Sequence, residues 1–159
     1  MKTLLLGMGN PILCDDAVGI RLAGAIAERL GPRPGLDVVE ECSIGGLNLI
    51  EVIAGYDRVI VLDSIMVGGG VPGGWYAFDA RSLRETLNLG NVHDANFATA
   101  LELGRAMGTP LPADDEIHVF AVEVADTTSF SEMMTATLEA ALPELTEEIG
   151  AEVEALLEG

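Results

Sequence analysis

The sequence predicts a three-layer α/β protein, with a twisted, mainly parallel (mixed) sheet of about five strands and helices on both faces. Two observations predict this fold. Short apolar segments typical of strands alternate along the chain with segments of helical periodicity, which favours parallel strands joined by helices. No repeat, low-complexity tract or linker divides the 159 residues, so we expect one domain over residues 1–159.

Five segments have the composition of strands, because short aliphatic or β-branched runs are bounded by turn residues. They span residues 3–7, 36–42, 58–65, 75–80 and 116–124. The run RVIVLDSI, residues 58–65, is apolar almost throughout, which is typical of a strand buried on both faces. The segment WYAFDA, residues 75–80, is expected at an edge of the sheet.

Helical periodicity, with apolar residues three or four positions apart, follows most of these strands. The expected helices span residues 17–30, 46–56, 82–88, 94–107 and 131–157. The first has Val18, Leu22, Ile26 and Leu30 along one stripe. The last contains Pro143 and is expected to kink there.

The net charge of −18 is unevenly distributed, since no Lys or Arg follows Arg105 while 13 Asp and Glu do. Such a surface disfavours nucleic acid and anionic membranes as partners. No apolar run approaches the roughly 20 residues of a membrane span, and the N-terminus has no signal-peptide layout. We therefore expect a cytoplasmic protein. Cys14 and Cys42 lack the spacing of a metal or redox pair, which predicts two small buried side chains.

The turn after the first strand is the first candidate for chemistry. Loops at the carboxyl ends of strands carry the ligands and reactive groups of α/β proteins, and this turn leads from Gly7 and Gly9 to Asp15 and Asp16. A dinucleotide-binding turn would need a third glycine where Ile12 stands. The carboxylates are therefore candidate metal ligands or catalytic acids, and either could instead cap the helix that follows.

Two further positions complete a candidate site. Asp63 stands at the end of a buried strand where the pattern predicts another hydrophobe, and His93 lies in the connection before the helix at 94–107. Either could be an ordinary loop residue when taken alone. Because the first and third strands of such a sheet usually lie close together, Asp16, Asp63 and His93 form a three-ligand set suited to nickel or zinc. His118 lies within a strand pattern and is expected to be structural.

The chain resembles the hydrogenase maturation endopeptidases, which process the large subunit of nickel-iron hydrogenases, over nearly its whole length. Three motifs in order carry this resemblance: a turn with glycines, asparagine and paired acids, an acid at the end of a buried strand, and a single histidine before a helix. The matching residues are Gly7, Gly9, Asn10, Asp15, Asp16, Gly19, Asp63 and His93.

The resemblance implies that Asp16, Asp63 and His93 are the metal-binding and catalytic residues. It also implies a substrate, the hydrogenase large-subunit precursor, from which a C-terminal peptide is removed after nickel insertion, with the nickel supplied by that precursor. The chain departs from the family at residues 41–46, where an Asp-Gly-Gly-Thr-type stretch is often present. The resemblance implies that this loop holds the C-terminal region of the substrate, so its altered chemistry bears on which precursor is processed.

The residues suggest metal-assisted hydrolysis, with the metal polarising a carbonyl or acidifying a water and a carboxylate acting as general base. A covalent mechanism pairing Cys14 with His93 is a weaker alternative. Two further classes stay open, namely a non-catalytic module that recognises a metal-loaded partner and a small-molecule hydrolase of the same fold. The glycine-rich segment 67–75 is expected to be a loop, because no Gly-Lys-Ser/Thr follows to bind a phosphate.

Overall fold

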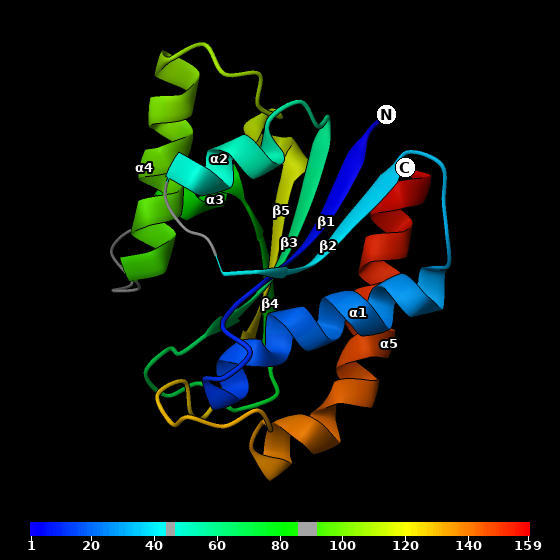
Figure 1. The fold of residues 1–159 in the computed structure, drawn as a ribbon, viewed down its shortest axis with the longest axis vertical. Helices are drawn as coiled ribbons and strands as arrows, with labels where there is room; N and C mark the ends of the chain where they lie inside the picture. Colours follow the sequence, from blue (N-terminus) through cyan, green and yellow to red (C-terminus); the bar gives the residue numbers. More distant parts are fainter. Residues whose placement is uncertain (44–46, 86–91) are drawn as a thin grey trace.

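The computed structural model describes residues 1–43, 47–85 and 92–159, and the side chains of residues 47, 83–85 and 92–96 lie outside that description. Its centre is a five-stranded sheet of order β2-β1-β3-β5-β4 (Figure 1). Four strands are parallel, and the edge strand β4 pairs antiparallel with β5. The strands are β1 (Thr3–Met8), β2 (Leu36–Cys42), β3 (Arg58–Ile65), β4 (Trp75–Asp79) and β5 (Ile117–Glu123).

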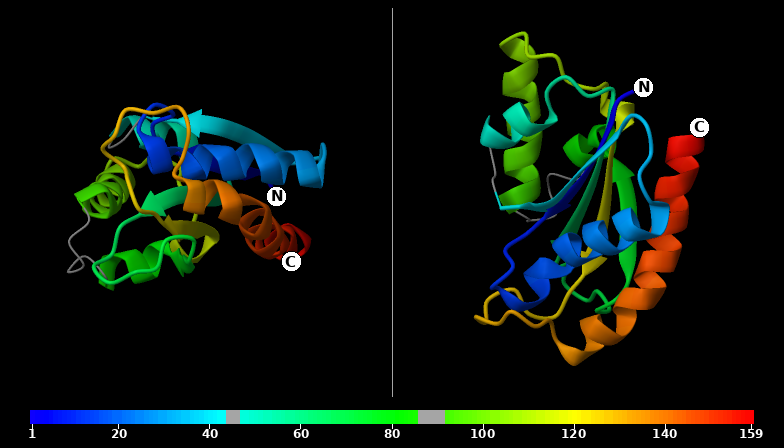
Figure 2. Two further views of the ribbon diagram at one scale, coloured as in Figure 1. Left: turned by 90° about the horizontal axis from the view of Figure 1, so that it is seen from below. Right: turned by 45° about the vertical axis from the view of Figure 1, so that its right-hand side comes forward.

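The helices form a layer on each face of the sheet, and the two further views show both layers (Figure 2). Helices α1 (Val18–Leu30) and α5 (Ala136–Glu158) cover one face, while α2 (Leu47–Ile53), α3 (Ala80–Glu85) and α4 (Val92–Ala106) lie on the other. This confirms the predicted three-layer fold. Helix α5 contains Pro143 and changes direction along its length, as a helix with an internal proline is expected to do (Figure 1).

The central strands are buried on both faces because their side chains alternate between two hydrophobic cores. In β3, Val59 and Val61 pack in the core under α2 and α4, whereas Ile60 and Leu62 pack in the core under α1 and α5. The alternation places Asp63 on the same face as Val59 and Val61. The register pairs Asp63 with Ala121 and Ile65 with Glu123, so Glu123 shares that face.

The first and the last of the predicted helices begin later in the chain than expected. The first is preceded by a 3-10 turn, η1 (Cys14–Ala17), and α1 begins at Val18. The last begins at Ala136 rather than 131, because residues 131–135 belong to a hydrogen-bonded loop. Within the described segments, no helix is both long and apolar enough to cross a membrane.

Candidate functional site

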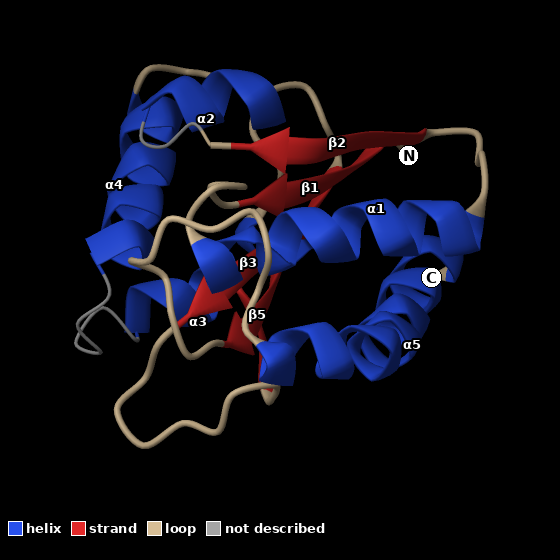
Figure 3. Cartoon of the chain, turned by 60° about the horizontal axis from the view of Figure 1, so that its bottom comes forward, coloured by secondary structure: helices blue, strands red, loops and turns tan. Residues whose placement is uncertain are grey.

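The loops at the carboxyl ends of β1, β3 and β5 form one edge of the molecule, because these strands are parallel and adjacent. They comprise residues 9–13 with the following η1 turn, residues 66–74, and residues 124–135. Figure 3 turns this edge forward and shows the loops gathered beside the start of α1. Asp16 and Asp63 both belong to this edge, as the sequence predicts.

A hydrogen bond connects the two acidic motifs directly. Asp16 is half-buried, and its Oδ1 accepts a hydrogen bond from the hydroxyl of Ser64 at 2.8 Å. Its Oδ2 accepts another from the backbone N–H of Asn10, also at 2.8 Å. Asp63, the neighbour of Ser64, is half-buried too, and its Oδ1 accepts from the Ser64 backbone N–H at 2.7 Å. Both carboxylates are therefore oriented by protein donors, and neither is sealed inside the core.

His93 is the second residue of α4, whereas the sequence places it in the connection before a helix that begins at 94. The helix starts two residues earlier than its apolar pattern indicates, because helix ends depend on capping and tertiary contacts more than on periodicity. Helix α4 begins toward the end of the sheet that carries Asp16 and Asp63 (Figure 1). The side chain of His93 lies outside the described residues. Among the described ones, no three His, Cys, Asp or Glu side chains form a group able to hold a metal, so the three-ligand set stays a prediction.

The glycines of the first turn allow two backbone segments to approach closely. Gly9 has φ +144°, and a Cβ there would lie 2.0 Å from the carbonyl oxygen of Asp16. A Cβ at Gly7 would lie 2.3 Å from the carbonyl oxygen of Glu40 in β2. The motif is therefore needed to fold the turn against η1 and the neighbouring strand. This role explains the glycines without a bound dinucleotide.

Asp15 does not cap the helix that follows it, contrary to one of the two expectations for this acid. The residue before α1 is Ala17, and neither η1 nor α1 has a side-chain cap. Asp15 is instead fully buried, and its Oδ2 accepts the backbone N–H groups of Ala125 and Asp126 at 3.0 Å each. Its Oδ1 accepts the backbone N–H of Thr135 at 2.7 Å, and the Thr135 hydroxyl lies 3.0 Å from both oxygens. Asp15 thus fixes the 124–135 loop and the start of α5.

Both cysteines are buried, as predicted, and no disulfide joins them. Cys14 has a positive φ of 53°, which no other described non-glycine residue shares. Burial, followed by the charge of Asp15, raises the pKa of the Cys14 thiol. A thiol held in its protonated form is a weak nucleophile, which disfavours the covalent alternative.

Glu123 is a buried acid at this edge that the sequence analysis did not single out. It is 2% exposed and ends β5. Its Oε1 accepts the backbone N–H of Val67 at 2.9 Å, while Oε2 has no hydrogen-bond partner among the described residues. Gly70 covers the carboxyl group so closely that a Cβ there would lie 2.3 Å from the carboxyl carbon. The signal was present in the sequence, since an acid interrupts the apolar run FAVEV just as Asp63 interrupts VIVLD.

His118 lies near the start of β5, at the opposite end of the strand from the candidate site. Its Nε2 is 3.9 Å from a carboxylate oxygen of Glu116, and burial, with the nearby charge of Arg58, lowers the pKa of the imidazole. This position agrees with the structural role predicted for it.

The altered segment at 41–46 is described only through residue 43. Within that part, Cys42 is buried against the core. Residues 44–46 lie outside the described part of the chain, so their effect on specificity stays a prediction.

Comparisons with known proteins show the family and the fold that this chain shares with them. Residues 20–156 match the family described as hydrogenase maturation protease. The hydrogenase 2 maturation protease of Escherichia coli (strain K12) is 30% identical over 73 residues, which are 46% of this chain and 44% of that protein. The chain thus aligns with less than half the length of this relative.

Two solved structures share the fold over nearly their whole length. The hydrogenase maturating endopeptidase HybD from E. coli superposes with a TM-score of 0.78 at 23% identity, covering 98% of this chain and 93% of that one. The [NiFe] hydrogenase maturation protease HybD from Thermococcus kodakarensis gives a TM-score of 0.69 at 20% identity, covering 96% and 99%. At these identities the two structures show the fold, and the family is shown by the match over residues 20–156.

Proposed function

The chain belongs to the hydrogenase maturation protease family, and from this premise we propose that it is a nickel-dependent endopeptidase. Its substrate is the large-subunit precursor of a nickel-iron hydrogenase, and it removes the C-terminal extension after nickel has been inserted. The observation that carries the proposal is the 2.8 Å hydrogen bond from Ser64 to Asp16. It connects the acid of the first turn to Ser64, the residue that follows Asp63 at the end of β3, at the edge where α/β proteins place their chemistry.

The nickel is part of the substrate, and Asp16, Asp63 and His93 are the residues that would hold it. Two half-buried carboxylates suit this task, since they can reach a partner that arrives from outside. Carboxylate and imidazole are both ligands that a divalent ion of intermediate softness accepts. When bound there, nickel would supply Lewis-acid chemistry by polarising the scissile carbonyl.

The chain's own donors prepare these side chains for binding. Asn10 and Ser64 donate to different oxygens of Asp16, which leaves each oxygen one further lone pair and fixes the plane of the carboxylate. Ser64 also donates its backbone N–H to Asp63, so a single residue orients both acids. Preorganised ligands of this kind lose little freedom when the substrate arrives. A carboxylate that is not occupied by the ion can take the proton of the attacking water as a general base.

The test is cleavage of a nickel-loaded large-subunit precursor, followed by mass spectrometry of the products, with nickel-free precursor in parallel. Asp16→Asn, Asp63→Asn and His93→Ala should each abolish cleavage, and His118→Ala should leave it intact. Cleavage independent of nickel would contradict the role of the ion. Binding of the precursor without any cleavage by the wild-type chain would favour a recognition module instead, and failure to bind would favour a hydrolase of small molecules.

The isolated protein should contain little metal, because nickel arrives with the precursor and two carboxylates with one imidazole form a weak, open site. Metal analysis after dialysis against a chelator checks this expectation. A stoichiometric ion that survives dialysis would indicate an ordinary metalloenzyme with a resident cofactor. We place the reaction in the cytoplasm, where a chain of this composition is expected to fold and meet its precursor.

A further inference from the structure

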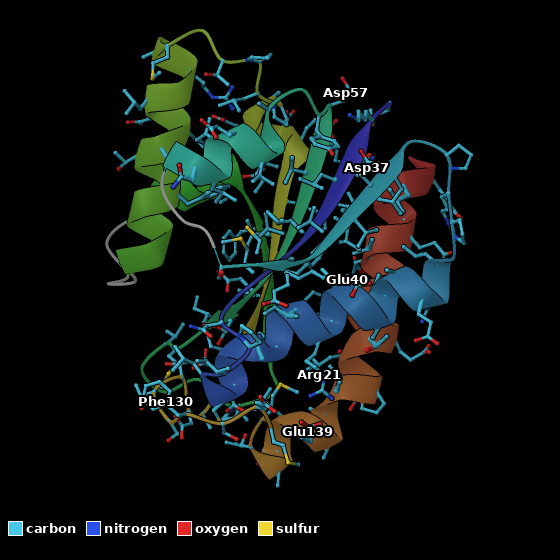
Figure 4. The ribbon with its side chains drawn as sticks, in the orientation of Figure 1. Arg21, Asp37, Glu40, Asp57, Phe130 and Glu139 are labelled. Atoms are coloured by element: carbon cyan, nitrogen blue, oxygen red, sulfur yellow. The ribbon has the colours of Figure 1, made fainter. Side chains whose placement is uncertain are left out.

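Exposed apolar side chains gather on the loops around the candidate site. Ile12, Met66, Phe130 and Met133 are 48%, 54%, 84% and 69% exposed, and we call these four residues the rim patch. They belong to the three loops that follow β1, β3 and β5. Figure 4 shows Phe130 at the end of the molecule opposite to Asp37 and Asp57, which lie near the starts of the strands. The rim patch therefore borders the same edge as Asp16 and Asp63.

Backbone pairing joins the loops that carry the rim patch. Leu13 and Ser131 form a parallel β-bridge, in which the Ser131 N–H donates to the Ile12 carbonyl at 2.9 Å. The Cys14 N–H donates to the Ser131 carbonyl at 3.0 Å. Ile12 is thus held beside the segment that contains Phe130 and Met133. The third loop is in contact as well, since the Thr127 hydroxyl lies 3.6 Å from the sulfur of Met66.

The 124–135 loop is also held in place by hydrogen bonds within the loop and by hydrogen bonds to buried Asp15. Asp126 accepts the backbone N–H groups of Thr128 and Ser129 at 2.9 Å each, and the Ser129 hydroxyl at 2.6 Å. These hydrogen bonds, that of the Ser129 hydroxyl first, lower the pKa of Asp126 to about 2, so the turn keeps its charged acceptor at neutral pH. Buried Asp15 binds the two ends of the same loop. Phe130 is therefore presented from a rigid tip.

Rigid presentation of exposed apolar side chains is the property of a binding surface. Contiguous exposed apolar groups on a soluble protein mark interaction sites. Aromatic residues and methionine are enriched where interfaces are most buried. Because the loops are already ordered, binding loses little conformational entropy. Buried polar groups thus hold hydrophobic side chains in positions exposed to water, and folding by itself does not require this exposure.

The net charge of the chain disfavours two of the possible partners of the rim patch. A second copy would also carry a net charge of −18, and an anionic membrane surface would be repelled in the same way. A protein substrate that brings its cleavage site to Asp16 and Asp63 must cover the edge that the rim patch borders. Asp126 and exposed Glu132 flank the apolar side chains, which favours basic residues on the partner.

We infer that the rim patch is the docking surface for the folded body of the precursor, through an apolar surface with basic flanks next to its C-terminal extension. This inference rests on the proposed function. It assigns to these loops the recognition of the substrate protein, separately from the side chains that bind nickel. Docking at the rim would hold the extension across the edge while Asp16, Asp63 and His93 engage the ion.

The test uses the full chain and nickel-loaded precursor, with Phe130→Ser and Met133→Ser made singly and together. We expect the double variant to raise KM about tenfold or more, because truncating central interface side chains weakens binding on that scale. The turnover rate at saturating precursor should stay within about twofold of wild type, since neither residue reaches the reacting atoms. Met107→Ser is the matched control, because Met107 is 70% exposed but follows the far end of α4 (Figure 1).

The outcomes separate this inference from the proposed function. A wild-type chain that does not cleave the precursor overturns the proposed function. A wild-type chain that cleaves, with rim variants whose KM matches that of Met107→Ser, overturns the docking surface alone. A fall in turnover with unchanged KM also overturns it. Sedimentation of the wild type as a dimer that Met133→Ser dissociates would assign the patch to a second copy and contradict the inference.

Discussion

Replacing Asp15 by Asn tests whether a buried carboxylate organises the whole catalytic edge. Asp15 accepts three backbone N–H groups, two at Oδ2 and one at Oδ1, in addition to the Thr135 hydroxyl. Asn keeps only one oxygen. If that oxygen retains the donors from Ala125 and Asp126, the new amide group faces the Thr135 N–H, donor against donor.

The expected loss follows from these contacts. One charge-assisted hydrogen bond disappears, at about 1.5–3 kcal/mol, and the partly buried Thr135 N–H loses its acceptor, at about 1–3 kcal/mol. The two remaining hydrogen bonds become weaker because their acceptor is neutral. Asn does not require a charge to be buried, and this gain offsets part of the total loss. We expect Asp15→Asn to lower the free energy of unfolding by about 3–4 kcal/mol, a large fraction of the stability of an ordinary domain. A helix-capping role would predict only about 0.5–1 kcal/mol.

Urea unfolding followed by far-UV circular dichroism at neutral pH measures this loss. Asp126→Asn is the matched control, since Asp126 also accepts backbone N–H groups, but within a local exposed turn where Asn is equally suitable. The control should lose much less stability than Asp15→Asn. A loss below about 1 kcal/mol for Asp15→Asn would refute the reasoning and restore the local helix-cap interpretation. Precursor cleavage by Asp15→Asn should also fall, because the loop that carries Phe130 loses its anchor.

Three further outcomes follow from the same packing. Glu123→Gln should change stability by less than about 1 kcal/mol, since glutamine keeps an acceptor and removes a buried charge. Gly70→Ala should destabilise by about 1–3 kcal/mol through overpacking against Glu123. Equal urea midpoints for these two variants would contradict this expectation. Gly19→Ala should lower the thermal midpoint, because its Cβ would lie 2.3 Å from a carbonyl oxygen of β3; an unchanged midpoint would show that α1 can shift. Because the pKa of His118 is lowered in the folded protein, the imidazole is protonated in the unfolded chain before it is protonated in the folded one as pH falls below 6.5. Wild-type stability should therefore decrease over this pH range. His118→Gln should remove this part of the decrease in urea titrations at about pH 7.5 and 5.5, and identical pH dependence in the two proteins would argue against it.

The segments whose structure depends on local burial could be predicted from the sequence. Strands β2 and β3 have the predicted bounds, because alternation or continuous apolar character is written residue by residue in the chain. The acid at the end of β3 stood out for the same reason, since Asp63 breaks an apolar run. The family motifs then led to Asp16 and Asp63, and the parallel register of β1 with β3 brings both acids to one edge.

Only the tertiary structure decided what the neighbouring acids do. Asp15 and Asp16 are adjacent in the chain, yet one is buried and binds Thr135, 120 residues away, while the other is half-buried and binds Ser64, 48 residues away. Sequence reasoning left a local helix cap open as an alternative for such residues, because capping is an interaction that adjacent positions in the chain can reveal. Glu123 was missed for a related reason, since its burial depends on Gly70 folding back over it.

The sequence by itself determined the order and type of the elements, and hence the α/β class, because periodic burial is a local property of the chain. The sheet order, the close approach that requires Gly9, and the bracing of the rim loops emerged only in three dimensions. Each of these depends on hydrogen bonds and contacts between segments far apart in sequence. Such partners are selected by the packing of the whole chain, and no periodicity in a single segment encodes them.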